Sequence, residues 1–181
     1  EGDVNVKVTV TEVDGSLEFN FHVIQPGEEG YTGQIGELNG VFFDLAGDQS
    51  DSLFMATTDE GVGLSLDSGE ASVSNLGGGI NMNGEVIKED GKYDVGLVTD
   101  ETGLGNGDTQ DITFILDADY DLSLADIANM DFGLRLTSVG DPDGSRDGSL
   151  KLGGEAPGEP TDPTDPTDPT DPTDPTDPTD P

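Results

Sequence analysis

Cysteine and tryptophan are absent from the sequence, histidine occurs once, and lysine and arginine together number six among 181 residues. The lack of thiols excludes cysteine nucleophiles, thiolate-bound zinc and iron–sulfur clusters. The scarcity of basic residues excludes the phosphate contacts on which nucleic-acid binding depends. No run approaches the ~20 apolar residues that span a bilayer as a helix, so we expect no membrane insertion.

Acidic residues dominate the composition. Forty aspartates and glutamates give the chain a formal charge of −34. Such a surface favours solubility in salt, where charges more than ~10 Å apart are screened, and it suits calcium, a hard cation that takes oxygen ligands. These features fit an extracellular or cell-surface setting. The absence of Met at position 1 indicates a processed piece from which any signal peptide has been removed.

The chain divides into a domain, residues 1–154, and an acidic, proline-rich tail, residues 155–181. Residues 161–181 are seven copies of Thr-Asp-Pro. Proline fixes φ near −65° and makes the preceding aspartate extended, so the repeat predicts a polyproline II spacer about 65 Å long. The tail is therefore a self-repelling linker or, alternatively, a stalk O-glycosylated on its threonine edge. The segment GGEAPGEP (153–160) is the expected hinge.

Alternating apolar residues predict β-strands through most of the domain. Residues 3–13 and 17–23 form the first two strands, and Asp14-Gly15 between them is a strong hairpin signal. Further strands are expected at residues 40–46, 52–57, 61–66, 71–75, 93–99, 111–117, 131–139 and 148–152. This series has no βαβ rhythm. It predicts an all-β fold, an antiparallel β-sandwich that is jelly-roll-like.

One short helix is expected to interrupt the strands, at residues 123–130. Ser123 and Asp126 have the spacing of a capping box, and Leu122 and Ile127 have that of a hydrophobic staple. The helix would pack across one end of the sandwich.

No residue pattern indicates an enzyme. His22 falls on the polar face of the second strand, and no GxSxG turn is present to expose a serine. Paired carboxylates can hydrolyse glycosides, but with forty acidic residues some pair always has a suitable spacing. We expect His22 to be a surface residue and the protein to have no catalytic activity.

Calcium is the favoured cofactor. Two segments cluster carboxylates: residues 117–121, with Asp117, Asp119 and Asp121, and the glycine-containing loop 141–147, with Asp141, Asp143 and Asp147. Calcium takes six to eight oxygen ligands, which such clusters supply. Neither segment matches the EF-hand pattern, and the alternative is that both are solvated turns. A weaker third cluster consists of Asp44, Asp48 and Asp51.

Two kinds of partner remain open. A polysaccharide would need exposed rings, and the inward phase of Phe19, Phe21, Phe43, Phe114 and Phe132 assigns these five to the core. The rings left for a ligand are Tyr31, Tyr93, Tyr120, Phe42 and Phe54. The alternative is self-assembly, because the N-terminal strand 3–13 pairs either within its own sheet or with the exposed edge of a neighbouring chain.

Four strings carry a resemblance to a known family: GELNGVFFDLAG (36–47), GLGNGDTQDITFIL (103–116), LSLADIANMDFGLRLTSVG (122–140) and GSLKLGG (148–154). With them the chain resembles a β-sandwich accessory module of large secreted proteins of marine bacteria, of the hemolysin-type (RTX) calcium-binding and adhesin class. Similar modules in that class are joined by TDP-type linkers. The resemblance implies an extracellular, calcium-rich setting. The glycine-rich nonapeptide array is absent here, and no site residue is carried over.

These observations predict a non-catalytic extracellular binding or adhesion module, stabilised by calcium, with a polysaccharide or another cell-surface molecule as the favoured partner. The alternative is a structural subunit that assembles with itself into an extracellular filament by strand addition.

Overall fold

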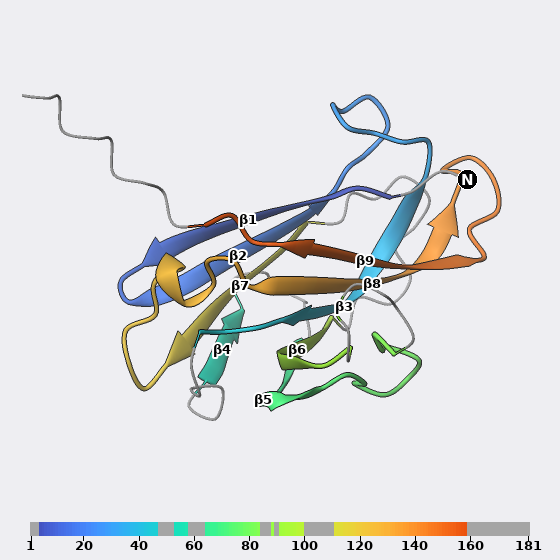
Figure 1. Ribbon diagram of the computed structural model, residues 1–181. Helices are drawn as coiled ribbons and strands as arrows, with labels where there is room; N and C mark the ends of the chain where they lie inside the picture. The colour runs from blue at the N-terminus through green and yellow to red at the C-terminus, as the bar shows by residue number, and fades with distance from the viewer. Residues whose placement is uncertain are drawn as a thin grey trace, which may run out of the picture.

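The computed structural model describes residues 4–46, 53–57, 64–83, 88, 91–99 and 111–158. These residues form nine strands in two antiparallel sheets, together with one turn of 3₁₀ helix (Figure 1). The all-β fold of antiparallel sheets expected from the alternating sequence is confirmed. Within these residues no helix has the length and apolar character needed to cross a membrane. The Thr-Asp-Pro repeats lie outside the described residues.

Sheet A has the strand order β1–β2–β7–β4. Its strands are β1 (Val6–Val13), β2 (Ser16–Val23), β7 (Asp111–Ala118) and β4 (Leu53–Thr57). Asp14 and Gly15 connect β1 to β2 with φ angles of 50° and 85°, the positive values that a two-residue type I′ turn requires. The predicted hairpin is confirmed, and β1 pairs with the next strand of its own chain at the edge of the sheet.

Sheet B has the strand order β5–β6–β3–β8–β9. Its strands are β5 (Leu64–Val73), β6 (Tyr93–Thr99), β3 (Ile35–Phe43), β8 (Asp131–Gly140) and β9 (Gly148–Glu155). The strand expected at 40–46 begins earlier, because Ile35 and Leu38 are also buried and a register shift near residue 39 interrupts the alternation. The segments expected at 61–66 and 71–75 meet in the single strand β5. Strand β9 continues one residue past the boundary expected at residue 154.

The main core lies between the two sheets and contains all five phenylalanines that were expected to point inward. The ring of Phe19 is central: its centroid is 5.1 Å from that of Phe114 in sheet A and 5.2 Å from that of Phe43 in sheet B. Such offset-stacked rings contribute beyond the area they bury. Phe19 thereby joins the two layers.

A second, smaller apolar cluster lies on the outer face of sheet B. Its buried members are Phe42, Val73, Met82 and Tyr93, and Leu76 and Ile80 pack against them. Residues 74–83 therefore form a cover over this face. The cover completely buries Phe42 and Tyr93, two of the rings that the sequence leaves for a ligand.

Glycines on three neighbouring strands make room for this cover. The three are Gly40 on β3, Gly96 on β6 and Gly133 on β8. A Cβ atom on Gly133 would lie 2.7 Å from the Tyr93 hydroxyl oxygen, and one on Gly96 would lie 2.6 Å from a methyl carbon of Val73. Both distances are below normal contact, so the cover packs on bare backbone.

The helix expected at 123–130 is reduced to the 3₁₀ turn η2 (Leu124–Asp126). The predicted cap is present, with the Ser123 N–H donating to the Asp126 carboxylate at 2.8 Å. The turn ends early because Asn129 has a left-handed φ of 58° and the chain enters β8 at Asp131. Leu122 and Ile127 are both buried in the core, as a staple requires.

Candidate binding groove

A groove of about 660 Å³ separates β1 from β9, the edge strands of the two sheets. Residues from 4–10 line one wall and residues 152–158 line the other. Phe132, Leu134, Leu124 and Ile127 are the main apolar residues beneath them. Strands β1 and β9 run in the same direction (Figure 1). The volume lies within the roughly 300–1,000 Å³ of ordinary ligand sites.

The β1 wall is apolar because its valines alternate. Val4 is completely buried, whereas Val8, two pleats further along the same face, is 37% exposed. The valine face of β1 is thus only partly covered by the opposite sheet. Each valine left in contact with water is apolar area that an occupant would bury, at about 25 cal/mol per Å².

The β9 wall leaves this space open because a glycine stands where a core side chain would fill it. Gly154 lines the groove, and a Cβ atom added to it would have no neighbour within 4 Å. Its backbone φ is outside the left-handed region, so a side chain at this position is sterically allowed. The groove is therefore a consequence of residue choice at Gly154 as well as of sheet geometry.

The free backbone edge of β1 faces the groove. The Ile24 N–H donates to the Asn5 carbonyl at 2.9 Å, which makes Asn5 a hydrogen-bonded position of the β1–β2 ladder. Such positions alternate along an antiparallel pair. The N–H and C=O groups of Val6, Val8 and Val10 consequently point away from β2.

The same reasoning applies to β9. The Ala156 N–H donates to the Met130 carbonyl at 2.9 Å, so the backbone groups of Gly153 and Glu155 point away from β8. Among the described strands, β1 pairs with β2 alone and β9 with β8 alone. Two unpaired strand edges therefore border one apolar groove, which is the arrangement that accepts an extended chain.

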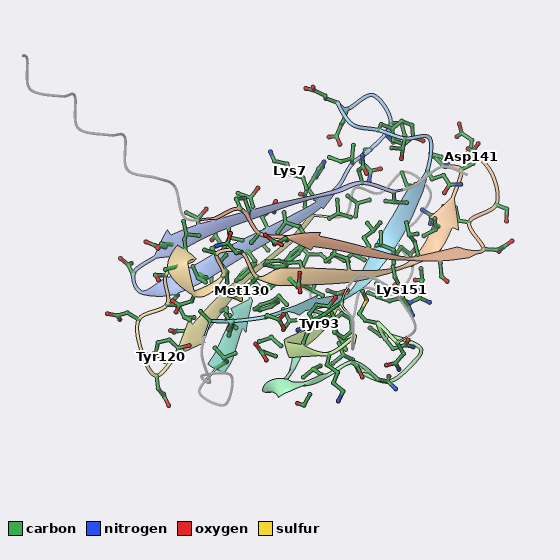
Figure 2. All side chains as sticks on the ribbon, in the orientation of Figure 1. Lys7, Tyr93, Tyr120, Met130, Asp141 and Lys151 are labelled. Carbon is green, nitrogen blue, oxygen red and sulfur yellow. The ribbon has the colours of Figure 1, made fainter. Side chains whose placement is uncertain are left out.

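Carboxylates gather at the η2 end of the groove. Glu155 lines it, and Asp131 lies opposite Glu155 in the β8–β9 register. The Glu12 carboxylate accepts the N–H of Leu124, a groove residue, at 2.6 Å, and Asp126 lies in the same turn. Lys7, the basic residue of β1, does not line the groove and lies nearer the other end of the strand (Figure 2).

His22 forms a separate polar cluster on the outer face of sheet A. Its Nδ1 lies 2.9 Å from the Asp111 carboxylate and its Nε2 lies 2.8 Å from that of Glu28. Hydrogen bonding to Glu28, and then to Asp111, raises the pKa of His22 above 6.5 against an opposing effect of burial. Glu28 also accepts the Gln25 N–H at 2.7 Å, and this bond, followed by that to His22, lowers the pKa of Glu28.

This arrangement suits structure better than catalysis. Both ring nitrogens of His22 lie beside carboxylate oxygens, which accept hydrogen bonds when ionised, so the arrangement favours the imidazolium form, in which both nitrogens donate. In that form neither nitrogen has a free lone pair with which to act as a general base. His22 instead fastens the loop at 24–34 to sheet A, and Asn5 also holds this loop by donating to the Gly30 carbonyl at 2.8 Å.

The loop 141–147, expected to bind calcium, is an exposed turn in which two of the three carboxylates accept hydrogen bonds from their own loop. The Asp141 carboxylate accepts the Asp143 N–H at 2.9 Å, and the Ser145 hydroxyl donates to the Asp147 carboxylate. Arg146 points inward and pairs with the buried Glu37 at 3.4 Å, which ties the loop to β3. Glu37 also accepts the Ser138 hydroxyl at 3.0 Å.

The residues expected as the other calcium segment, 117–121, do not converge. Asp117 accepts the N–H of Ala118 at 2.9 Å, Asp119 is exposed, and Asp121 lies beside Gly15 in the hairpin turn. Figure 2 shows Tyr120, in this segment, and Asp141 at opposite ends of the molecule. Within the described residues no three acidic or histidine side chains are grouped closely enough to hold a metal. Calcium binding stays a prediction.

Asp44, from the weaker third cluster, lies beside a lysine. Its carboxylate is 2.6 Å from the Lys88 ammonium and accepts the Asp94 N–H at 3.3 Å. Burial raises the pKa of Asp44, while the hydrogen bond and charge of Lys88 act against this. Asp48 and Asp51 lie outside the described residues, as does the side chain of Phe54.

Sequence patterns identified the valine strand but not the groove it lines. The glycines and prolines of segment 153–160 predict a hinge, whereas residues 153–155 complete β9. The Pro157 carbonyl accepts the Asn129 N–H at 3.4 Å. Glycine and proline at the end of a strand are also typical of sheet edges. That signal was present in the sequence and points to an exposed edge.

No protein-family model, curated protein or solved structure matches this chain.

Proposed function

We propose that residues 4–158 form a non-catalytic binding module and that the groove between β1 and β9 receives an extended polypeptide strand. The observation that carries this proposal is the pair of unpaired edges on the two sides of one apolar groove. A strand laid there would hydrogen-bond to the backbone of Val6 and Val8 on one side and of Gly153 on the other. Its alternate side chains would cover the exposed valines.

A strand fits this groove better than the polysaccharide favoured from the sequence. Sugars need exposed aromatic faces, and the aromatic residue that lines the groove, Phe132, is 8% exposed and belongs to the core. Unpaired N–H and C=O groups along a strand edge are instead satisfied by another backbone.

The order of the strands supports a jelly-roll-like fold. The chain crosses repeatedly between sheets A and B, at β2–β3, β3–β4, β4–β5, β6–β7 and β7–β8. The composition supports an extracellular or cell-surface setting, with calcium available to the acidic loops. The Thr-Asp-Pro tail supports a role as a polyproline II spacer that holds the module away from whatever it is attached to.

Binding of a neutral test peptide would examine the groove directly. The probe is a capped peptide of about eight residues that alternates valine and serine, within the usual length of a strand. With the isotope-labelled full chain, we expect NMR shift changes at the amides of Val6, Val8, Gly153 and Glu155. The same peptide with every second amide N-methylated should bind more weakly, because it cannot donate along one edge.

The matched variants are Gly154→Val and Thr11→Val. Gly154→Val fills the groove, and Thr11→Val adds apolar area on the same β1 strand but outside the groove lining. We expect Gly154→Val alone to abolish the shifts, and to raise stability by about 0.5–2 kcal/mol as cavity-filling changes do. Absence of shifts in the parent chain, or a polysaccharide that binds Gly154→Val and parent equally well, would contradict the proposed site.

A further inference from the structure

The groove is apolar along β1 and acidic near its η2 end, which restricts the chemistry of a strand that can bind there. This inference rests on the proposed function. We infer that the partner is a cationic strand in which apolar residues alternate with lysine or arginine. The apolar half of this pattern follows from the valines of β1 and from the groove floor. The basic half follows from the carboxylate of Glu155, which lines the groove near its η2 end, and from that of Asp131, which lies opposite Glu155 in the β8–β9 register.

The geometry of an inserted strand places its basic residues beside Glu155 and Asp131. Successive side chains of a strand point to opposite faces, so one set faces the groove floor and the other faces solvent. On the β9 side, the solvent-facing set lies next to Glu155, with Asp131 one strand further. Opposite charges on neighbouring strands stabilise the pairing, and like charges in those positions destabilise it.

The chain's own tail does not supply such a strand. Residues 159–181 contain proline at every third position from Pro160, and proline has no N–H to donate to a neighbouring edge. Proline is also their sole apolar residue type, so nothing in this segment would cover the valines of β1. Its aspartates would meet the carboxylates at the η2 end with like charge.

A second copy of the chain is also disfavoured as the occupant. Two copies each carry a formal charge of −34, and their repulsion is reduced but not reversed by salt. Strand β1 of another copy has the apolar alternation but brings Glu12 as well as Lys7. A partner with a net positive strand gains attraction at the same site where a second copy meets repulsion.

Two peptides that differ only in charge test this inference. Each is capped, has about eight residues and alternates valine with either lysine or glutamate. We expect the lysine peptide to bind the full chain at least about tenfold more tightly than the glutamate peptide at low ionic strength, with the difference shrinking as salt is added. The NMR shifts should again fall on Val6, Val8, Gly153 and Glu155.

Variants separate specific recognition from general attraction to a polyanion. The double variant Glu155→Gln/Asp131→Asn should lose most of the preference for lysine, whereas Asp143→Asn/Glu29→Gln, which removes the same charge from exposed loops, should keep it. Gly154→Val should bind neither peptide. Binding of the lysine peptide to Gly154→Val as tightly as to the parent would overturn the inference, because that attraction would not involve the groove.

The remaining outcomes distinguish the two proposals. If the lysine and glutamate peptides bind equally and both shift the groove amides, strand addition stands and the cationic preference is wrong. If neither these peptides nor the valine–serine peptide binds, the proposed function fails and the preference fails with it. Filaments of the full chain under electron microscopy at low salt would show that a second copy is the occupant, and would also overturn the inference.

Discussion

His22 on β2 and Asp111 on β7 are direct partners in the register of sheet A, and 2.9 Å separates Nδ1 from the carboxylate oxygen. On the other side of His22 in the sheet, its register partner on β1 is Lys7. The loop at 24–34 contributes Glu28 to the second ring nitrogen. His22 thus lies between two carboxylates, which favour its imidazolium form and raise its pKa.

The stability of the protein should fall as pH rises through the pKa of His22. Because this pKa is raised above 6.5 in the folded chain, the stability it contributes is fully present below about pH 6.5 and is lost as pH climbs through the raised value. The measurement is the urea midpoint between about pH 6 and about pH 9. The sequence has one histidine and no cysteine, so a change in this range is readily assigned to His22. Replacing His22 with Gln should flatten the profile. An unchanged slope in that variant would show that another group is responsible.

Low pH should also weaken the His22 cluster, in this case by protonating Glu28. The pKa of Glu28 is lowered below its ordinary 4.5, so the stability it contributes is present above that value and is lost as pH falls through the lowered pKa. NMR titration of the His22 ring should show a lower pKa in Glu28→Gln than in the parent, with Glu29→Gln as the control. Identical titration curves in all three proteins would contradict the assigned contact.

Gly133→Ala should destabilise the protein by about 1–3 kcal/mol, because its Cβ would overlap the Tyr93 hydroxyl and a methyl group of Met82. Gly154→Ala is the matched control, since a Cβ there meets no atom within 4 Å. Chemical denaturation measures both. Adding Tyr93→Phe to Gly133→Ala should recover part of the loss, which a double-mutant cycle quantifies. Equal stability of the two alanine variants would contradict the packing of residues 74–83 on sheet B.

Arg146→Met should cost about 1–3 kcal/mol, since it leaves the carboxylate of Glu37, which is 7% exposed, without its cationic partner. The double variant Arg146→Met/Glu37→Gln should be more stable than Arg146→Met alone, because the uncompensated charge is then absent. The quantity to compare is the free energy of unfolding from denaturant curves. If the double variant is the less stable of the two, the pair is not coupled as described.

Calcium, if bound, should raise the melting temperature by an amount that grows with the free ion concentration. Binding at about 100 times the dissociation constant stabilises the folded state by about 2.7 kcal/mol. Melting curves with calcium and with chelator give this difference for the parent, for Asp141→Asn/Asp143→Asn and for Asp117→Asn/Asp119→Asn. Loss of the difference in one double variant would locate the ion. Superimposable curves for the parent in calcium and chelator would remove the calcium prediction.

The features that the sequence predicted are those determined by residues close together in the sequence. Asp14-Gly15 tolerates positive φ and therefore forms the hairpin turn wherever the flanking strands pair. Phe19 and Phe21 alternate with polar residues, which determines the face they present to the core. The Ser123–Asp126 cap also formed, although the turn it begins is shorter than expected because Asn129 redirects the chain.

The features that the sequence did not predict depend on which distant strands lie side by side in the folded sheets. Phe42 was correctly placed on the outer face of β3, yet it is buried because Gly96 and Gly133 stand beside it in the register and residues 74–83 pack over all three. The groove similarly exists only because the first strand and the last strand of the domain end up at facing edges. No local pattern contains this information.

The parallel course of β1 and β9 has a mechanical consequence. Because both strands run the same way, the start of β1 and the end of β9 lie at opposite ends of the molecule (Figure 1). A pull between residues 4 and 158 therefore acts along the strands, and the hydrogen bonds of the β1–β2 and β8–β9 ladders share the load instead of breaking one at a time. Under the proposed function, the same pull would also load the hydrogen bonds that hold a strand between β1 and β9.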